Sequence, residues 1–129
     1  VYTYNRFRFD DGSRFDDNTL PMIPEHFGNF EVLYEHPLGF YLGLNVTAAD
    51  NVFVDFANTV EAKSYAILGA RIGYKSRRGL SAFVEIQNLT DEAYTNRIDP
   101  IADAGGQDVQ RFLPGLTRSV FVGVEWRWR

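Results

Sequence analysis

The chain has 129 residues, no cysteine, a formal net charge of −4 and an aromatic content of 16%. Without cysteine it forms no disulfide, no cysteine-ligated zinc site and no thiol nucleophile, and its acidic balance argues against nucleic acid, whose binding depends on basic side chains that displace phosphate counterions. The length accommodates one domain, and no apolar run reaches the roughly 18 residues that a transmembrane helix needs.

Apolar and polar side chains alternate with a period of two along most of the chain, and this pattern predicts antiparallel β-strands rather than helices. The alternation is clearest between Ser119 and Trp128, where valine and tryptophan side chains share one face while Gly123 and Glu125 lie on the other. We expect about six such strands. In chain order they cover residues 1–9, 26–35, 39–48, 65–75, 80–89 and 118–128.

The connections between these strands differ in length. Residues 36–39 and 76–79 form tight turns with Pro or Gly at turn-forming positions. The other connections are long and polar, and they cover residues 10–24, 49–63 and 90–117. Most loops in compact soluble domains are brief, whereas outer-membrane barrels have short periplasmic turns at one end and long extracellular loops at the other. The pattern therefore favours part of the wall of a bacterial outer-membrane β-barrel.

The two faces of the expected strands differ in chemistry. One face is aliphatic and aromatic and would meet lipid, while the other is rich in polar residues and would meet the lumen of a wide barrel. On the lumen side we expect cross-strand ion pairs or contact with a plug, and the charged residues there are Arg71, Glu85, Glu125 and Arg127. Aromatic residues near the short turns would form an interfacial girdle. These are Tyr34, Tyr74, Trp126 and Trp128.

The last strand resembles the C-terminal signal by which barrel proteins are recognised for outer-membrane insertion. In the segment from Phe121 to Trp128, Gly123 precedes Trp126 by three residues and Trp128 by five. The resemblance implies that Gly123, Trp126 and Trp128 belong to a membrane-insertion signal.

The whole chain resembles the C-terminal barrel segment of a TonB-dependent outer-membrane receptor. The most specific match is the segment Val84–Tyr94, which is similar to the family's box of the form NL-x-D-x-x-Y near the penultimate strand. Further segments resemble the family in the same order along the chain. They are residues 20–26, 39–46, 57–65, 99–101, 112–115 and 118–120.

This resemblance implies a piece of a barrel with 22 strands and a plug, located in the bacterial outer membrane. The complete receptor would import a scarce small molecule or metal chelate such as a ferric siderophore. Its partners would be outer-membrane lipid, the rest of the barrel, the plug, and the TonB complex through a missing N-terminal part. No cofactor is expected.

Candidate binding residues lie in the last long connection, because ligand contacts concentrate on loops held by a rigid scaffold. The candidates are Tyr94, Arg97, Asp99, Gln107 and Arg111. For each of them a solvated surface position is the alternative interpretation. The sequence shows no pattern of catalytic or metal-ligating residues, so we expect no enzyme and no metal site.

Two other interpretations remain open at this point. The first is a small self-contained outer-membrane barrel of about eight strands, an adhesin or a lipid-modifying enzyme, with further strands near residues 52–56 and 109–113. The second is a soluble β-sandwich binding module, in which the apolar faces of two sheets pack together. Pairing between the first and last strands would distinguish the small barrel from a piece of a larger one.

Overall fold

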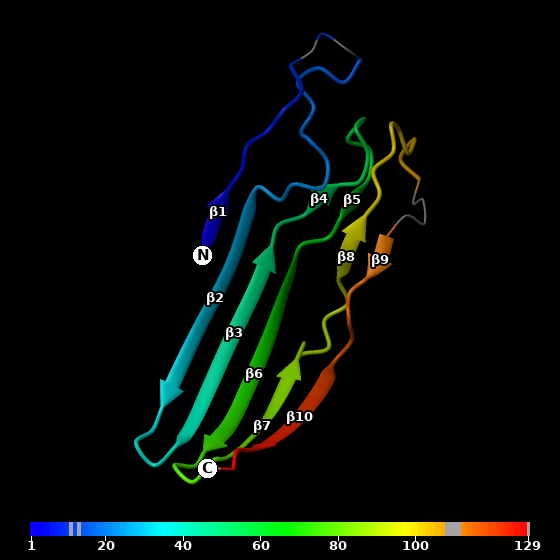
Figure 1. Cartoon of the computed structure of the whole chain (residues 1–129). Helices are drawn as coiled ribbons and strands as arrows, with labels where there is room; N and C mark the ends of the chain where they lie inside the picture. The colour runs from blue at the N-terminus through cyan, green and yellow to red at the C-terminus, as the bar shows by residue number, and fades with distance from the viewer. Residues whose placement is uncertain (11, 13, 108–111, 129) are drawn as a thin grey trace. The chain divides into compact units, whose positions relative to one another are not determined.

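The computed structural model describes residues 1–10, 12, 14–107 and 112–128, and its regular secondary structure in this part is entirely β-strand (Figure 1). The strands are β1 (Tyr2–Tyr4), β2 (His26–Glu35), β3 (Phe40–Ala49), β4 (Val52–Phe53), β5 (Glu61–Ala62), β6 (Tyr65–Lys75), β7 (Leu80–Gln87), β8 (Thr95–Ile98), β9 (Phe112–Pro114) and β10 (Ser119–Trp126). No helix in the described part is long and apolar enough to cross a membrane.

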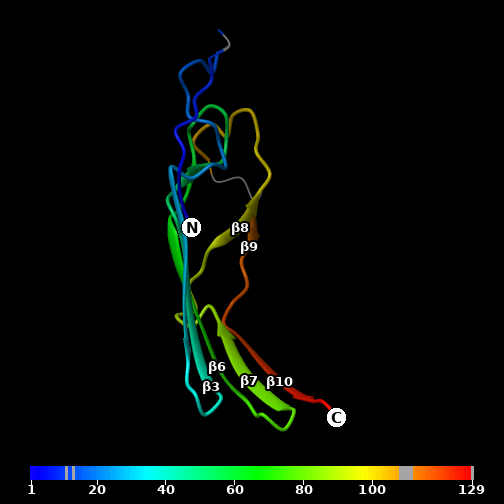
Figure 2. The same ribbon diagram turned by 60° about the vertical axis from the view of Figure 1, so that its left-hand side comes forward.

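The described residues form one large sheet with the strand order β1-β2-β3-β6-β7-β10, so its neighbours follow one another along the chain. The pairs β1–β2, β6–β7 and β7–β10 are antiparallel, and β7 and β10 lie side by side in Figure 2. The remaining strands form the short ladders β4–β5 and β8–β9 inside the long connections. The expected fold class, an all-β antiparallel meander, is confirmed.

The large sheet is open in the described part of the chain. β1 and β10 are its two edges, and the residues of β10 pair with β7 rather than with β1. This contradicts the small closed barrel considered as an alternative. The strand that this alternative required near residues 52–56 forms as β4, which pairs with β5 in a two-stranded ladder instead of extending the wall. Of the strand required near residues 109–113, residues 109–111 lie outside the described residues, while Phe112 and Leu113 belong to β9, which pairs with β8 in a second ladder.

The chain divides into two compact units. We call residues 1–28, 48–65 and 93–115 the loop unit, because they contain most of the long connections. We call residues 29–47, 66–92 and 116–129 the strand unit, because they contain the tight turns and most of the length of the large sheet.

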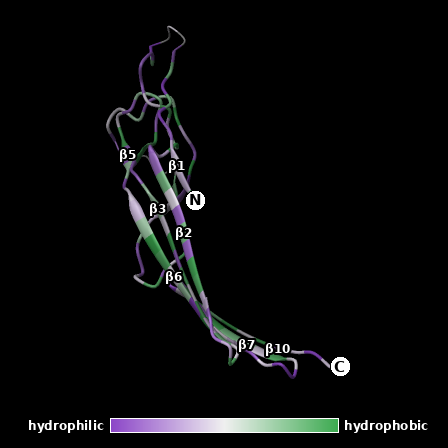
Figure 3. Ribbon diagram, turned by 90° about the vertical axis from the view of Figure 1, so that its left-hand side faces the viewer, coloured by the Kyte–Doolittle hydropathy of each residue, from purple (hydrophilic) through white to green (hydrophobic). Residues whose placement is uncertain are grey.

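The apolar face of the strand unit is bare. Val122 and Val124 of β10 are 71% and 72% exposed, and Val32 of β2 and Ile72 of β6 are exposed as well. Figure 3 shows hydrophobic stretches along β2 and β6. In the described residues the buried hydrophobic side chains are Val54, Ala62 and Ala104, all in the loop unit. A soluble sandwich would cover such a face with a second sheet, and the described strand unit contains none. The sandwich alternative is therefore wrong.

Several strands are shorter than the sequence pattern predicts. β1 ends at Tyr4, because residues 7–9 bond to residues 18–20 of the following loop: the Phe9 amide donates to the Asn18 carbonyl (2.9 Å) and the Leu20 amide to the Phe7 carbonyl (3.0 Å). β7 ends at Gln87, because Asn88 adopts a left-handed backbone with φ of 51° that turns the chain out of the sheet.

Both tight turns depend on glycine. Gly39 and Gly79 have φ values of 96° and 91°, which side chains with a Cβ atom rarely adopt. A Cβ atom would also collide with the Lys75 carbonyl at Gly39 and with the Arg127 carbonyl at Gly79. These turns hold β2 to β3 and β6 to β7 with minimal loop length, as the sequence predicts.

Candidate functional site

The loop unit is organised around Asp55, which lies between β4 and β5 and is fully buried. Its Oδ1 accepts hydrogen bonds from the backbone amides of Thr59 (2.9 Å) and Val60 (3.2 Å). Its Oδ2 accepts from the Thr59 hydroxyl (2.6 Å) and the Ala104 amide (3.0 Å). Burial by itself raises the pKa of the Asp55 carboxyl, but these donors stabilise the charged form, and the net effect lowers the pKa below its usual value. Asp55 is therefore a buried carboxylate with satisfied oxygens.

Asn58 joins the same segment to the first long connection. Its backbone is left-handed, with φ of 56°, a conformation that Asn tolerates better than most residues. The Thr19 amide donates to Asn58 Oδ1 (2.7 Å), and Asn58 Nδ2 donates to the Thr19 carbonyl (2.9 Å). Asn18 Nδ2 donates to the Phe56 carbonyl (2.8 Å). Residues 55–60 thus contact both of the other long connections through hydrogen bonds.

A cavity of about 360 Å³ opens in the loop unit between the ends of β4 and β5, the start of β6 and the strand β8. Lys63 and Arg97 bring positive charge to its lining, Asp50 brings negative charge, and Phe27 and Tyr65 bring aromatic surface. Pockets with aromatic walls and a few charged groups are typical of small-molecule sites. This cavity is the best candidate for a ligand-binding surface in the described part of the loop unit.

The structure separates the residues that the sequence suggested for ligand binding. Arg97 lines the cavity and forms an ion pair with Asp99 (Nη2–Oδ1 3.2 Å) on the exposed surface. Tyr94 is half-buried and packs its ring against Tyr65, with 5.1 Å between centroids. Gln107 is exposed, and its backbone amide donates to the Ala104 carbonyl (3.1 Å). Arg111 lies outside the described residues.

Of these candidates, Arg97 is the one described residue that borders the cavity. The other cavity residues with charge or aromatic rings, Phe27, Asp50, Lys63 and Tyr65, were not predicted from the sequence. They flank the long connections rather than lying at their centres, so a search for polar loop residues passes over them. Phe27 and Tyr65 lie at the starts of β2 and β6, so an aromatic residue at the start of a strand was the available signal. A ligand role for any of these residues remains a prediction.

The box around Asn88 has a structural role in the strand unit. Asn88 is buried, and its Nδ2 donates to the carbonyls of Glu92 (2.9 Å) and Leu116 (2.9 Å) while its Oδ1 accepts from the Glu92 amide (2.8 Å). Asp91 Oδ1 accepts from the Arg118 amide (2.8 Å). The two side chains therefore hold the end of β7 to the segment that enters β10.

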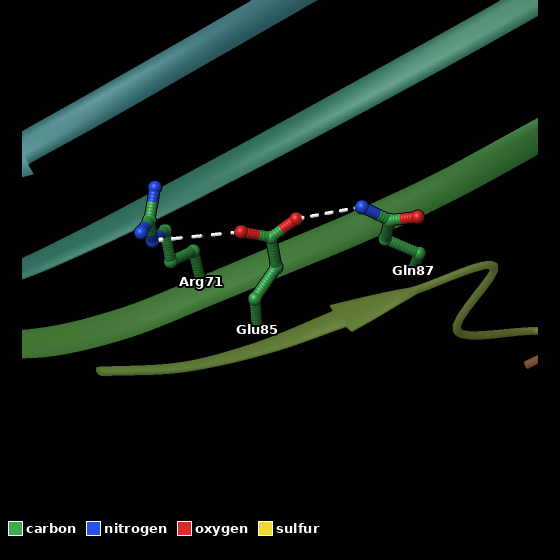
Figure 4. Close-up of polar contacts among 3 residues, drawn as sticks. All are labelled: Arg71, Glu85 and Gln87. Atoms are coloured by element: carbon green, nitrogen blue, oxygen red, sulfur yellow. Dashed lines mark hydrogen bonds and ion pairs between the residues drawn. The ribbon is translucent and has the colours of Figure 1, made fainter. Parts of the chain in front are cut away.

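The polar face of the strand unit carries the expected cross-strand ion pair. Arg71 of β6 and Glu85 of β7 are directly opposed in the ladder, with 3.5 Å between Nε and Oε2. Gln87 Nε2 donates to Oε1 of the same Glu85 (2.8 Å) (Figure 4). The Arg71 guanidinium also lies over the Phe83 ring, 4.0 Å from its centroid. Because both charged groups are partly exposed, the pair contributes less than about 1 kcal/mol.

The proposed insertion signal is also part of this packing. Gly123 pairs with Phe83, and a Cβ atom at Gly123 would collide with the Phe83 ring. Trp126 and Trp128 contact edge to face, with 6.2 Å between ring centroids, and both are exposed. Gly123 is thus required for close packing within the sheet, while its role in membrane insertion remains a prediction.

A one-layer antiparallel sheet with a bare apolar face, a polar opposite face and long loops at alternate connections defines a segment of a transmembrane β-barrel wall. The family model described as TonB dependent receptor-like, beta-barrel matches residues 1–89. The chain therefore belongs to this family, as its resemblance to TonB-dependent receptors indicated. Members of the family are receptors of the outer membrane and act in transport rather than as enzymes.

Individual relatives agree with the family. The chain is 28% identical over 100 residues to the ferrioxamine receptor of Yersinia enterocolitica, an alignment that covers 72% of this chain and 14% of the receptor. It is similar in structure to the unliganded ferric citrate transporter FecA, with a TM-score of 0.79, 21% identity and coverage of 97% of this chain and 20% of FecA. For the siderophore receptor PiuA from Acinetobacter baumannii the TM-score is 0.74 and the identity 23%, with 91% of this chain and 16% of PiuA covered.

These likenesses differ in what they establish. The two structural matches are less than 25% identical in sequence to this chain, so they show the fold alone. The chain spans between 14% and 20% of the length of these relatives. For this chain, the activity of a whole receptor is therefore a proposal.

Proposed function

We propose that this chain forms a C-terminal part of the barrel wall of an outer-membrane receptor that imports a ferric siderophore. The observation that carries the proposal is the division of the strand unit into a bare apolar face and a polar face with the Arg71–Glu85 ion pair. In a barrel of 22 strands the first face contacts lipid and the second lines a plugged lumen. Family membership and the ferrioxamine receptor relative support transport as the activity.

The open edges of the sheet support the proposal that the rest of the barrel completes it. An unpaired strand edge in lipid leaves amide and carbonyl groups without partners, which costs several kcal/mol per group. The described residues pair β10 with β7 and β1 with β2, and in the strand order each of these outer strands has one neighbour. Strands of the same receptor would satisfy both edges, and the plug would fill the lumen.

The cavity beside Lys63 and Arg97 supports a ligand role for the loop unit. Its charged and aromatic lining suits a polar chelate that carries both carbonyl oxygens and apolar linkers. Ferrioxamine is the first ligand to test, because the relative from Yersinia enterocolitica is a ferrioxamine receptor. Energy for transport would come from the inner-membrane TonB complex acting on a part of the receptor outside this chain.

The test is uptake of ⁵⁵Fe-labelled ferrioxamine by cells that carry or lack the complete receptor. We expect accumulation that requires both the receptor and an intact TonB complex, and that exceeds accumulation of ⁵⁵Fe-labelled ferric citrate. Equal uptake in cells without the receptor would contradict the transport proposal. Receptor-dependent uptake of ferric citrate instead of ferrioxamine would keep the transport proposal and replace the ligand.

A further inference from the structure

We infer that Asp55 is the positioning residue of the proposed ligand site, because its carboxylate joins the connection between β4 and β5 to the loop that follows Arg97. This inference rests on the proposed function for its ligand, whereas the loop junction itself rests on the geometry alone. The two parts can therefore fail separately.

The two oxygens of Asp55 have different partners. Oδ1 accepts from the amides of Thr59 and Val60, so it closes a turn within its own connection. Oδ2 accepts from the Ala104 amide, which is 49 residues away in sequence and belongs to the last long connection. One oxygen therefore folds the local turn, and the other holds a distant loop against it.

Backbone hydrogen bonds extend the same junction. The Phe56 amide donates to the Ile101 carbonyl (3.0 Å), and the Ala57 amide donates to the Ala102 carbonyl (3.1 Å). The Gly106 amide donates to the Thr59 hydroxyl (3.1 Å), which itself donates to Asp55 Oδ2. The segment 101–106 is thus fixed along residues 55–59, with the carboxylate at its buried centre.

The junction matters for the cavity because segment 101–106 follows β8 directly. β8 (Thr95–Ile98) carries Arg97 and supplies four neighbouring residues of the cavity lining. β8 is held on one side by its ladder with β9, and the chain beyond it is held by Asp55. Loss of the Ala104 bond would leave this chain held by the backbone bonds to Ile101 and Ala102 and by the Gly106–Thr59 bond, a weaker junction in which the position of the Arg97 guanidinium is less defined.

The most informative variant is D55N in the complete receptor. Asn keeps an oxygen that can accept from the Thr59 and Val60 amides, but it places an NH₂ group where Oδ2 stands. That group cannot accept from the Ala104 amide, so the local turn survives while the link between the loops loses its bond at Ala104 and keeps its backbone bonds at Ile101 and Ala102. T59S is the conservative control, because it retains the hydroxyl that bonds both Asp55 and Gly106.

Amide hydrogen exchange of the receptor in detergent tests the junction without any ligand. A hydrogen bond to a buried charged group is worth enough that its loss accelerates local exchange by about tenfold or more. We expect this acceleration in peptides from residues 102–106 of D55N, with residues 58–62 and the strand peptides close to wild type. The T59S receptor should match wild type throughout.

Ferrioxamine binding to the same proteins tests the positioning role. We expect D55N to raise the Kd for ferrioxamine by about tenfold while the number of binding sites stays unchanged, and we expect T59S to bind with wild-type affinity. Unchanged exchange at residues 102–106, or unchanged Kd when exchange there has increased, would overturn the inference. If wild-type receptor does not bind ferrioxamine, the ligand assignment fails and the exchange result still decides the junction.

If D55N does not reach the outer membrane, T59V provides the second route. It removes the hydroxyl that links Gly106 to Asp55 but leaves the Ala104 bond in place. Exchange should then increase near Gly106 and less at Ala104. Equal protection of both amides in T59V and wild type would also overturn the inference.

Discussion

Replacing Asn88 by alanine should lower the free energy of unfolding of the barrel. The structure gives two contributions to this loss, from hydrogen bonds and from backbone strain. The side chain is 2% exposed and bonds the Glu92 amide and the carbonyls of Glu92 and Leu116. At about 1 kcal/mol for each bond, their loss costs about 3 kcal/mol. Alanine at a φ of 51° adds about 1 kcal/mol of backbone strain, which Asn largely avoids. N88A should therefore lower the free energy of unfolding by about 4 kcal/mol.

The matched control is N88G. Glycine adopts the left-handed conformation without strain, so it loses the hydrogen bonds but not the backbone compatibility. We expect N88G to cost about 3 kcal/mol, which leaves the strain as the difference between the two variants.

The measurement is urea unfolding of the complete receptor refolded into lipid vesicles, with the free energy obtained by linear extrapolation. A loss below about 0.5 kcal/mol in N88A, the range of ordinary surface substitutions, would refute the assignment of Asn88 as a structural residue. Equal losses in N88A and N88G would refute the strain contribution alone.

Further predictions concern the sheet faces and the buried carboxylate. G123A should lower the unfolding free energy by about 1–3 kcal/mol through collision with Phe83, and the double variant with F83A should recover part of this loss in the same assay. V122R, on the apolar face of β10, should cost about 2–4 kcal/mol in lipid, and a result as small as that of V122L would contradict lipid contact. Because the pKa of Asp55 is lowered from 3.8 by its donors, its stabilisation is complete above that pH and is lost as pH falls through the lower folded value. The difference in urea midpoint between wild type and D55N should therefore shrink only below about pH 4; a difference that already shrinks between pH 7 and 5 would contradict the assignment.

The strands could be predicted from the sequence because their signal is local. In β10 each valine and tryptophan has its partner on the same face two residues away, so the period of two is visible without knowledge of the fold. β4 and β5 have two residues each, too few to show any period. The end of β7 at Gln87 was missed because the alternation does not show that Asn88 adopts a left-handed backbone.

The site was less predictable because its contacts are distant in sequence. Asp55 and Ala104 meet across 49 residues, and no local pattern connects an aspartate with an alanine amide so far away. Arg97 was a candidate from the sequence and does line the cavity, but it lies in the short strand β8, and its place in the same lining as Lys63 depends on how two connections fold together. Sequence reasoning therefore identified the loop that carries the candidate residues and not the residues that arrange it.

The two buried polar side chains of the described residues, Asp55 and Asn88, lie where the backbone is outside the large sheet. Inside a sheet the ladder satisfies amides and carbonyls, but beyond it these groups need other partners when they are buried. A buried Asp or Asn supplies them, and in doing so it fixes the course of a loop. The basic side chains of the cavity, Lys63 and Arg97, are exposed and bond neither Asp55 nor Asn88. Under the proposed function, substitution of these exposed residues should therefore change the ligand while the loops keep their arrangement, whereas substitution of Asp55 or Asn88 should alter the arrangement itself.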